Sequence, residues 1–258
     1  LMGNAYAGFT HVCAQSETDA QRYREIGVVD AQLTVTGNLK FDMHIPLEQV
    51  AAGERIKRLL TDTRVIMLAS SREGEEQLWL EAIAEFEQTH AQTEKAPPRT
   101  QWWIVPRHPQ RFDEVMALLK STGKHVVRKS ELDAQPAAQQ INALAQADMV
   151  LGDTMGEMFA YYAIADIVLM GGTWLPYGGQ NFLEPMALGK PVWVGESIYN
   201  FEQIGLEALR SEVLSQAQNL FLALENIQLF QTHATNIPIL VFIQQRCGVV
   251  EKINALLL

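Results

Sequence analysis

Several features that are common in other classes of protein are scarce in this chain of 258 residues. It has only two cysteines, Cys13 and Cys247, and no C-x-x-C pair. This count fits a reducing compartment and argues against a zinc site. No run of about 18 apolar residues occurs, so we expect no segment to span a bilayer. Residues 1–10 lack a basic signal-peptide start, and we expect the chain to be soluble.

Motifs for metal ions and dinucleotides are also missing. The six histidines do not cluster at metal-ligand spacing, and no D-x-D pair occurs. We therefore expect no metal and no cofactor. Because G-x-G-x-x-G is absent, a dinucleotide-binding fold is disfavoured. The net charge of −10 argues against a nucleic-acid-binding protein, for which a basic face is expected.

From Val65 onward, short apolar segments alternate with amphipathic helical patterns. The expected strands are residues 65–69, 102–105, 126–127, 149–151, 167–170 and 192–194. The expected helices are residues 47–60, 73–90, 112–119, 155–163 and 182–188. This alternation predicts an α/β fold, a parallel sheet with helices on both faces.

The two ends of the chain give weaker patterns. Strands are expected at residues 9–14 and 33–36, with a helix at 17–26 that Ser16 caps. Segments 89–100 and 133–140 are expected to be loops. After residue 206 the pattern favours helices at 218–230 and 241–257, with a strand at 236–243 as an alternative. No site is predicted beyond residue 206.

Polar or glycine-rich clusters follow four of the expected strands. They are residues 70–74 (S-S-R-E-G), 106–109 (P-R-H-P), 152–157 (G-D-T-M-G-E) and 171–184. In parallel sheets, ligands lie beyond the carboxyl ends of the strands. The sequence therefore predicts one ligand site formed by these clusters.

The cluster at 171–184 has the most features of a ligand loop. Gly178 and Gly179 would allow the backbone to approach a ligand closely. Asn181 is expected to cap the helix that follows, and the start of such a helix suits an anion such as phosphate. Glu184, in the first turn, either compensates the helix dipole or accepts hydrogen bonds from sugar hydroxyls. The sequence leaves both roles open.

Three other clusters have an ordinary structural explanation beside the functional one. Arg107, which lies between two prolines near a strand end, is either a phosphate clamp or a solvated side chain on a rigid turn. Thr154 and Glu157 fit a capping box, and a capped helix start can also bind an anion. The segment 70–76 is interpreted mainly as a serine cap followed by acidic residues.

The segment 171–201 resembles the 3-deoxy-D-manno-octulosonic acid (Kdo) transferases of lipopolysaccharide synthesis, which are glycosyltransferases of the two-domain GT-B fold. The resemblance rests on its glycine pairs and on N-F-L-E-P and G-K-P-V. It continues in Q-S-E-T-D-A, V-T-G-N-L-K-F-D, P-R-H-P-Q-R and D-T-M-G-E, and so covers residues 9–201. Gln180 and Glu196 depart from the family, which usually has His and Pro there.

This resemblance implies a GT-B type, Rossmann-like parallel sheet with helices on both faces. Residues 1–45 would be the end of the N-terminal (acceptor) domain and the linker, and residues 46–258 the C-terminal domain that binds CMP-Kdo. The implied reaction transfers Kdo from CMP-Kdo to a lipid A precursor with inversion at the anomeric carbon.

The resemblance also implies which residues contact the donor. They are Pro106, Arg107, Met155, Gly156, Glu157, Asn181, Phe182, Leu183 and Glu184. Arg107 and the helix starts near Gly156 and Asn181 would stabilise CMP as it leaves, and Glu184 would hold the ribose.

The catalytic base of this family is a Glu in a glycine-rich segment that precedes everything in this sequence. No catalytic residue is therefore expected here, and we expect this chain alone to be inactive. The same missing part is expected to bind the lipid A precursor and the membrane surface, on the cytoplasmic side of the bacterial inner membrane. Two alternatives remain: a GT-B enzyme that uses a UDP-sugar, such as an epimerase or a glycogen-synthase-like transferase, or a non-catalytic nucleotide-binding module.

Overall fold

The computed structural model describes the chain except for residues 1–5, 7, 92–98, 230–235 and 257–258. The chain divides into two compact units, one of Leu1–His44 with Val241–Leu258 and one of Ile45–Leu240. We expected a boundary after residue 45 and a second domain that runs to residue 258. The structure instead groups the last 18 residues, Val241–Leu258, with the first unit.

The first unit begins with a small parallel pair of strands, β1 (Val12–Ala14) and β2 (Leu33–Val35). Helix α2 (Glu17–Glu25) lies between them in sequence. The hydroxyl of Ser16 accepts a hydrogen bond from the backbone N–H of Asp19 at 3.1 Å, so the expected cap is confirmed. Both strands are shorter than expected.

The carboxyl-terminal part of the chain is helical. Helix α12 (Ile237–Gln244) occupies the segment for which a strand was the alternative, and that alternative is wrong. The single helix expected at 241–257 is divided, because Gly248 has a φ of 86° and helix α13 (Val249–Ala255) begins after it. Within the first unit, the carboxylate of Asp42 accepts from the N–H groups of Gly248 and Val250 at 2.7 and 2.6 Å.

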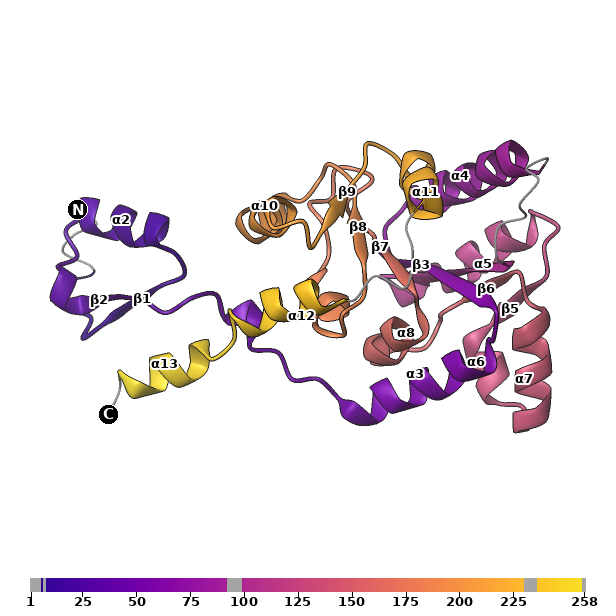
Figure 1. Ribbon diagram of the computed structural model, residues 1–258, viewed down its shortest axis with the longest axis horizontal. Coiled ribbons are helices and arrows are strands. Elements are labelled where there is room, and N and C mark those ends of the chain that lie inside the picture. The colour runs from indigo at the N-terminus through magenta and orange to yellow at the C-terminus, as the bar shows by residue number, and fades with distance from the viewer. Residues whose placement is uncertain (1–5, 7, 92–98, 230–235, 257–258) are drawn as a thin grey trace. The chain divides into compact units, whose positions relative to one another are not determined.

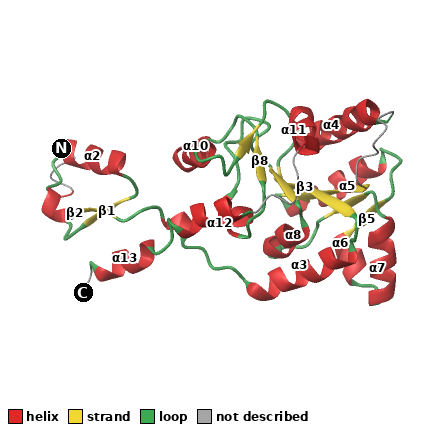
Figure 2. Cartoon of the chain, in the orientation of Figure 1, coloured by secondary structure: helices red, strands yellow, loops and turns green. Residues whose placement is uncertain are grey.

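The second unit is built on a sheet of seven strands, and all its pairings are parallel (Figure 1; Figure 2). The strand order is β5-β6-β4-β3-β7-β8-β9. The strands are β3 (Thr63–Ser71), β4 (Arg99–Pro106), β5 (Val126–Arg128), β6 (Met149–Leu151), β7 (Ile167–Met170), β8 (Val192–Val194) and β9 (Ser215–Gln216). The predicted parallel sheet is confirmed, and β9 was not predicted because it has only two residues.

Helices cover both faces of this sheet, as predicted. Figure 1 shows α4, α5 and α11 on one face and α3 and α8 on the other. The helices are α3 (Leu47–Leu59), α4 (Glu75–His90), α5 (Phe112–Lys120), α6 (Lys129–Asp133), α7 (Ala137–Gln146), α8 (Met158–Ile164), α9 (Leu183–Ala187), α10 (Glu202–Arg210) and α11 (Leu220–Leu229).

Alternate residues of the central strands pack on the two helical layers. Ile66 and Leu68 belong to the apolar cluster under α4, where Trp79 and Trp102 meet edge to face with ring centroids 5.4 Å apart. On the other face, α3 and α8 approach closely at Gly53. A Cβ atom there would lie 2.2 Å from the carbonyl oxygen of Ala160, so only glycine fits.

Of two expected loops, one is largely helical and the other lies mostly outside the described residues, and one helix was not predicted. Residues 133–140 fall largely in α6 and α7, because alanine and glutamine are good helix formers and Pro136 precedes the first residue of α7. Most of the polar segment 89–100 lies outside the described residues. Helix α10 was not predicted at all.

Candidate functional site

Four loops meet at the carboxyl edge of the sheet, because the strands that precede them, β6, β4, β3 and β7, are neighbours. The N–H of Arg107, after β4, donates to the carbonyl oxygen of Ser71 at 2.9 Å. Gly171, after β7, lies against the end of β3, where a Cβ atom would be 2.4 Å from the oxygen of Ser70. The predicted convergence of these clusters is therefore present in the structure.

A group of polar side chains lies in the middle of this edge. The hydroxyl of Tyr162 on α8 lies near Ser70, at the end of β3, and near the carboxylate of Glu184 on α9, and both side chains influence its pKa. The amide of Asn181 donates to the same carboxylate at 3.1 Å. Arg107 is close enough to act electrostatically on both Tyr162 and Glu184.

The charges in this group are partly buried. Burial raises the pKa of Glu184, while hydrogen bonds from Asn181 and Tyr162 and the charge of Arg107 act to lower it. Burial also raises the pKa of Tyr162 well above its usual value, and the neighbouring Glu184 carboxylate adds to this shift. Tyr162 therefore stays protonated at any ordinary pH.

The loop after β6 is held by its own set of contacts. Asp153 accepts from the backbone N–H and the hydroxyl of Ser130 at 2.8 and 2.6 Å. The hydroxyl of Thr154 bonds to the carboxylate of Glu157 and to the hydroxyl of Tyr161. Burial raises the pKa of Tyr161 to about 12. Met155, in contrast, is exposed over 60% of its surface.

The capping box expected at Thr154 and Glu157 is not formed. Helix α8 begins at Met158, three residues later than expected, so Glu157 itself is the cap residue and Thr154 lies too far upstream. Gly156 is exposed, and its carbonyl oxygen accepts from the amide of Gln49 at 2.8 Å.

The segment after β3 is structural in a way that the sequence did not indicate. The carboxylate of Glu75 is fully buried and accepts from three backbone N–H groups, of Arg72, Gly172 and Trp174, at 2.7–3.0 Å. Burial raises the pKa of Glu75, and these hydrogen bonds oppose the shift. Glu75 thus ties the glycine loop after β7 to the start of α4.

The expected serine cap of α4 is wrong. The cap residue is Gly74, with a φ of 86° and no side-chain hydrogen bond. The hydroxyl of Ser71 donates instead to the buried carboxylate of Glu76 at 2.7 Å, which also forms an ion pair with Arg111. Oxygen Oε2 of Glu76 is buried without a hydrogen-bond partner among the described residues.

The glycine pair at 178–179 does not have the role that the sequence suggested. The N–H of Gly178 donates to the hydroxyl of Ser197 at 2.8 Å, and the N–H of Gly179 donates to the carbonyl oxygen of Gly172 at 2.7 Å. A Cβ atom at Gly178 would lie 2.3 Å from the ring of Tyr199. These glycines therefore permit positive φ and close packing within the protein rather than the approach of a ligand.

Helix α9 is shorter than expected and begins at Leu183. Asn181 lies one residue before the cap position, and its Oδ1 accepts from the N–H of Leu183 at 3.2 Å. Phe182 and Leu183 are each 0% exposed, backbone included, so neither presents a surface to a ligand in this structure. Since α9 has five residues and α8 has seven, the expected anion sites at their starts have little helix dipole behind them.

The structure adds residues that sequence reasoning missed. Tyr161 and Tyr162 are both 1% exposed. The hydroxyl of Tyr161 bonds to Thr154 in the loop after β6, and Tyr162 lies close enough to Glu184 for each to shift the pKa of the other. The sequence did contain a signal for them: two tyrosines in an apolar helix indicate buried hydroxyl groups, and a buried hydroxyl group needs a polar partner nearby. Ser70 has a φ of 56°, a strained value for a residue other than glycine, and no sequence pattern announced it.

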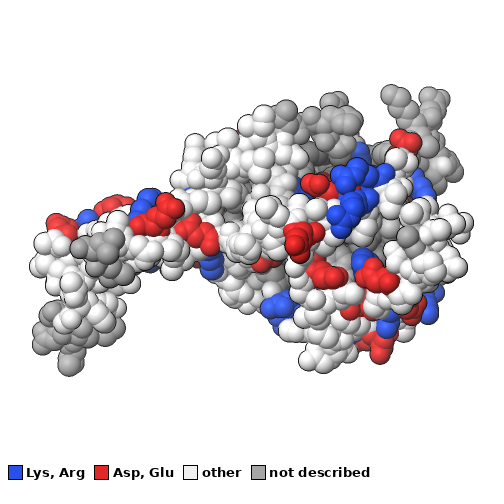
Figure 3. Space-filling view, turned by 90° about the horizontal axis from the view of Figure 1, so that it is seen from below, with Lys and Arg blue, Asp and Glu red and all other residues white. Residues whose placement is uncertain are grey.

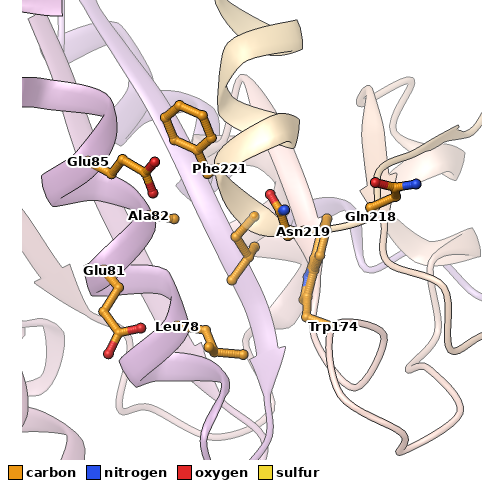
Figure 4. A pocket seen from close by; sticks show the side chains of 9 residues that line it. Leu78, Glu81, Ala82, Glu85, Trp174, Gln218, Asn219 and Phe221 are labelled. Carbon is orange, nitrogen blue, oxygen red and sulfur yellow. The ribbon is translucent and has the colours of Figure 1, made fainter. Parts of the chain in front are cut away.

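A hollow of about 250 Å³ lies between α4, α11 and the loop after β7. Figure 4 shows Glu81 and Glu85 on one side of this hollow and Phe221 and Trp174 on the other. None of the expected donor-contact residues lines it. On the face in Figure 3, acidic and basic side chains are interspersed.

The described part of the chain contains neither a group of three potential metal ligands among His, Cys, Asp and Glu nor a helix long and apolar enough to cross a membrane.

Sequence comparisons connect this chain to named proteins. A family model described as 3-Deoxy-D-manno-octulosonic-acid transferase (kdotransferase) matches residues 1–43. The chain is 38% identical over 221 residues to a 3-deoxy-D-manno-octulosonic acid transferase of Bordetella pertussis, which covers 86% of this chain and 48% of that protein. A transferase with the same description from Haemophilus influenzae is 31% identical over 194 residues, with coverages of 75% and 42%. The chain spans about half the length of these curated relatives.

Structural comparisons agree. The C-terminal CMP-Kdo binding domain of WaaA from Acinetobacter baumannii matches with a TM-score of 0.62 and 27% identity, over 80% of this chain and 99% of that one. A glycosyltransferase from Rickettsia africae shares the fold, with a TM-score of 0.55, 13% identity, and coverage of 99% of this chain and 66% of that one. The expected α/β fold of GT-B type is confirmed by the match to the WaaA domain.

Proposed function

We propose that this chain, which is a homologue of the Kdo transferases, is the donor-binding part of an enzyme that transfers Kdo from CMP-Kdo to a lipid A precursor. The observation that carries this proposal is the group of Arg107, Tyr162, Asn181 and Glu184. It lies at the carboxyl edge of a sheet that matches the CMP-Kdo binding domain of WaaA.

In this proposal, each part of the edge binds a different part of CMP. The exposed guanidinium of Arg107 binds the phosphate, because its planar fork of donors suits phosphate oxygens. Glu184 accepts hydrogen bonds from the ribose hydroxyls. The loop Met155–Glu157, which follows β6, also contacts the CMP moiety. Pro106 fixes the loop of Arg107, and Phe182 and Leu183 anchor the segment that carries Glu184.

The chemistry is a displacement at the anomeric carbon of Kdo, with inversion and with oxocarbenium character. The bond from that carbon to the phosphate breaks, and its electron pair goes to CMP, whose charge Arg107 stabilises. The acceptor hydroxyl loses its proton to a base that we place in the acceptor domain. That domain would also bind the lipid A precursor at the cytoplasmic face of the bacterial inner membrane.

A comparison of nucleotides by thermal melting and calorimetric titration tests this function. CMP is expected to raise the melting temperature more than UMP or UDP, since only a ligand of the folded state stabilises it. EDTA is expected to leave CMP binding unchanged. A preference for UDP would indicate an enzyme that uses a UDP-sugar. CMP binding without transfer, in a protein that includes the acceptor domain, would indicate a non-catalytic module.

A further inference from the structure

A second arginine lies beside Arg107 at the carboxyl edge of the sheet. The parallel pairing of β3 with β4 places Ser71 opposite Pro106. Arg72 and Arg107 are therefore the next residues on two neighbouring strands, and the N–H of Arg107 donates to the carbonyl oxygen of Ser71 at 2.9 Å. Neighbouring strands are about 4.8 Å apart, so the two arginine side chains start from adjacent points of this edge.

The local structure supports Arg72 from two sides. Its backbone N–H donates to the buried carboxylate of Glu75 at 2.8 Å. Its guanidinium lies over the ring of Tyr177, with Cζ 4.6 Å from the ring centroid. The hydroxyl of Tyr177 donates to the carbonyl oxygen of Glu73 at 3.0 Å, so the ring is tied to the same loop. An aromatic ring attracts the cation through its face and takes up none of the N–H donors of the guanidinium in ordinary hydrogen bonds.

The charges of these two arginines are not neutralised by the protein. In the part of the chain that the structure describes, neither Arg72 nor Arg107 forms an ion pair with a carboxylate. Arg111, four residues after Arg107, differs in this respect, because it pairs with Glu76 and Glu114. Two neighbouring cations repel each other, and a ligand with two anionic groups relieves that repulsion.

The donor of the proposed reaction has two such groups close together. Kdo is a ulosonic acid, in which the carboxylate is attached to the anomeric carbon. The oxygen that links Kdo to the phosphate of CMP is attached to the same carbon, so only this carbon and this oxygen separate the carboxylate from the phosphorus. The planar fork of a guanidinium suits both carboxylate and phosphate oxygens.

We propose that Arg72, supported by Tyr177, binds the carboxylate of Kdo, while Arg107 binds the adjacent phosphate. This inference rests on the proposed function, because it takes CMP-Kdo as the ligand. Arg72 then recognises the sugar acid and has no contact with CMP alone. It is the residue that distinguishes a CMP-linked ulosonic acid from a nucleotide-linked sugar without an acid group.

The test compares CMP with CMP-Kdo in calorimetric titrations of the full chain. Arg72→Ala should leave CMP affinity unchanged and lower CMP-Kdo affinity by about 10- to 150-fold, the range for hydrogen bonds to charged groups. Arg72→Lys should lose less CMP-Kdo affinity, because lysine keeps the charge without the planar fork, and it keeps the test valid if Arg72→Ala does not fold. Tyr177→Leu removes the aromatic support and should act in the same direction as Arg72→Ala, but more weakly.

Two other variants serve as references. Arg107→Ala should weaken the binding of CMP and CMP-Kdo alike, because both ligands contain the phosphate. Arg58→Ala, which removes an exposed arginine on α3, should change neither affinity.

The role of Arg72 and the proposed function fail in different ways. If folded Arg72→Ala binds CMP-Kdo as the wild type does, or loses affinity for CMP and CMP-Kdo by the same factor, the role of Arg72 is refuted and the proposed function stands. If the wild-type chain binds neither CMP nor CMP-Kdo, the proposed function fails and the role of Arg72 fails with it.

Discussion

Glu75 and Glu184 both lie in the first turn of a helix at the carboxyl edge of the sheet, α4 and α9. Glu75 is fully buried, and its carboxylate binds three backbone N–H groups of the protein. Glu184 is half-buried, and its carboxylate accepts from the side-chain amide of Asn181 at 3.1 Å. A carboxylate surrounded by backbone donors has a structural role, whereas one held by a side chain at an open edge has acceptor capacity left for a ligand.

The largest effect is expected for Glu75→Ala, on stability. The substitution leaves the N–H groups of Arg72, Gly172 and Trp174 without their acceptor in a buried place. We expect the free energy of unfolding to fall by about 3 kcal/mol or more, since each hydrogen bond to a charged group is worth about 1.5–3 kcal/mol and such values add incompletely. Urea unfolding measures this change.

Glu73→Ala is the control for that experiment, because Glu73 is an exposed neighbour. It should change stability by less than about 0.5 kcal/mol. Glu75→Gln adds a test of charge. Burial raises the pKa of Glu75, so its contribution to stability is present below the unfolded pKa and is lost as the pH rises through the folded pKa. Glutamine does not titrate, so the Glu75→Gln variant should lack that part of the pH dependence. If the free energy of unfolding changes with pH equally in the variant and the wild type, this role of Glu75 is refuted.

The contrast between the two glutamates shows what sequence patterns predict here. The alternation of apolar segments predicted the parallel sheet. The rule that ligands lie beyond the carboxyl ends of parallel strands predicted where the polar clusters meet. The first inference depends on the periodicity of apolar residues, which is local in the sequence. The second depends on a rule that holds for parallel sheets in general. The assignment of Glu75 to three N–H groups depends on the loop after β7, about 97–99 residues away in sequence for Gly172 and Trp174, and no local pattern encodes it.

Short helices were predicted less well for a physical reason. Capping motifs at Thr154 and Asn181 placed the starts of α8 and α9 too early, because side-chain oxygens near a helix end can bond to other groups. Thr154 bonds to Glu157 and Tyr161. Likewise, Gly178 and Gly179 looked like a ligand loop, but their N–H groups are bonded within the protein.

The next effect in size is expected for Arg107→Ala, on CMP affinity. If Arg107 binds the phosphate, the loss of its hydrogen bonds should weaken binding by about 1.5–3 kcal/mol, or about 10- to 150-fold. Calorimetric titration measures the affinity. Arg58→Ala is the control, since Arg58 is an exposed arginine on α3 with only a 3.8 Å ion pair to Glu54. Unchanged CMP affinity in a folded Arg107→Ala variant would exclude Arg107 from the site.

A smaller loss is expected for Glu184→Gln. The change replaces an ionised acceptor with a neutral amide, and we expect it to cost about 1–2 kcal/mol of CMP binding. Most of the preference for CMP over 2′,3′-dideoxy-CMP should disappear with it. Glu85→Gln, on the exposed side of α4, should bind both nucleotides as the wild type does. If Glu184→Gln has a changed melting temperature but unchanged binding of both nucleotides, then Glu184 serves only the helix end.

The smallest effect is expected for Asn181→Ala, and it tests how far stability and binding are separate at this edge. Asn181 accepts from the N–H of Leu183 and donates to Glu184. Loss of the first bond should lower the free energy of unfolding by about 1 kcal/mol, as for other residues that cap a helix start. Loss of the second removes a side-chain donor to Glu184, so CMP affinity should also fall, but by less than in Glu184→Gln.

Asn219→Ala is the matched control for this variant, because Asn219 accepts from the N–H of Leu222 at 2.8 Å at the start of α11, away from the expected donor-contact residues. It should lose a similar amount of stability in urea unfolding and keep the wild-type CMP affinity. If Asn181→Ala and Asn219→Ala behave alike in both measurements, Asn181 acts only on the helix. If only Asn181→Ala loses affinity, the same side chain both starts α9 and supports the carboxylate that we assign to the ribose.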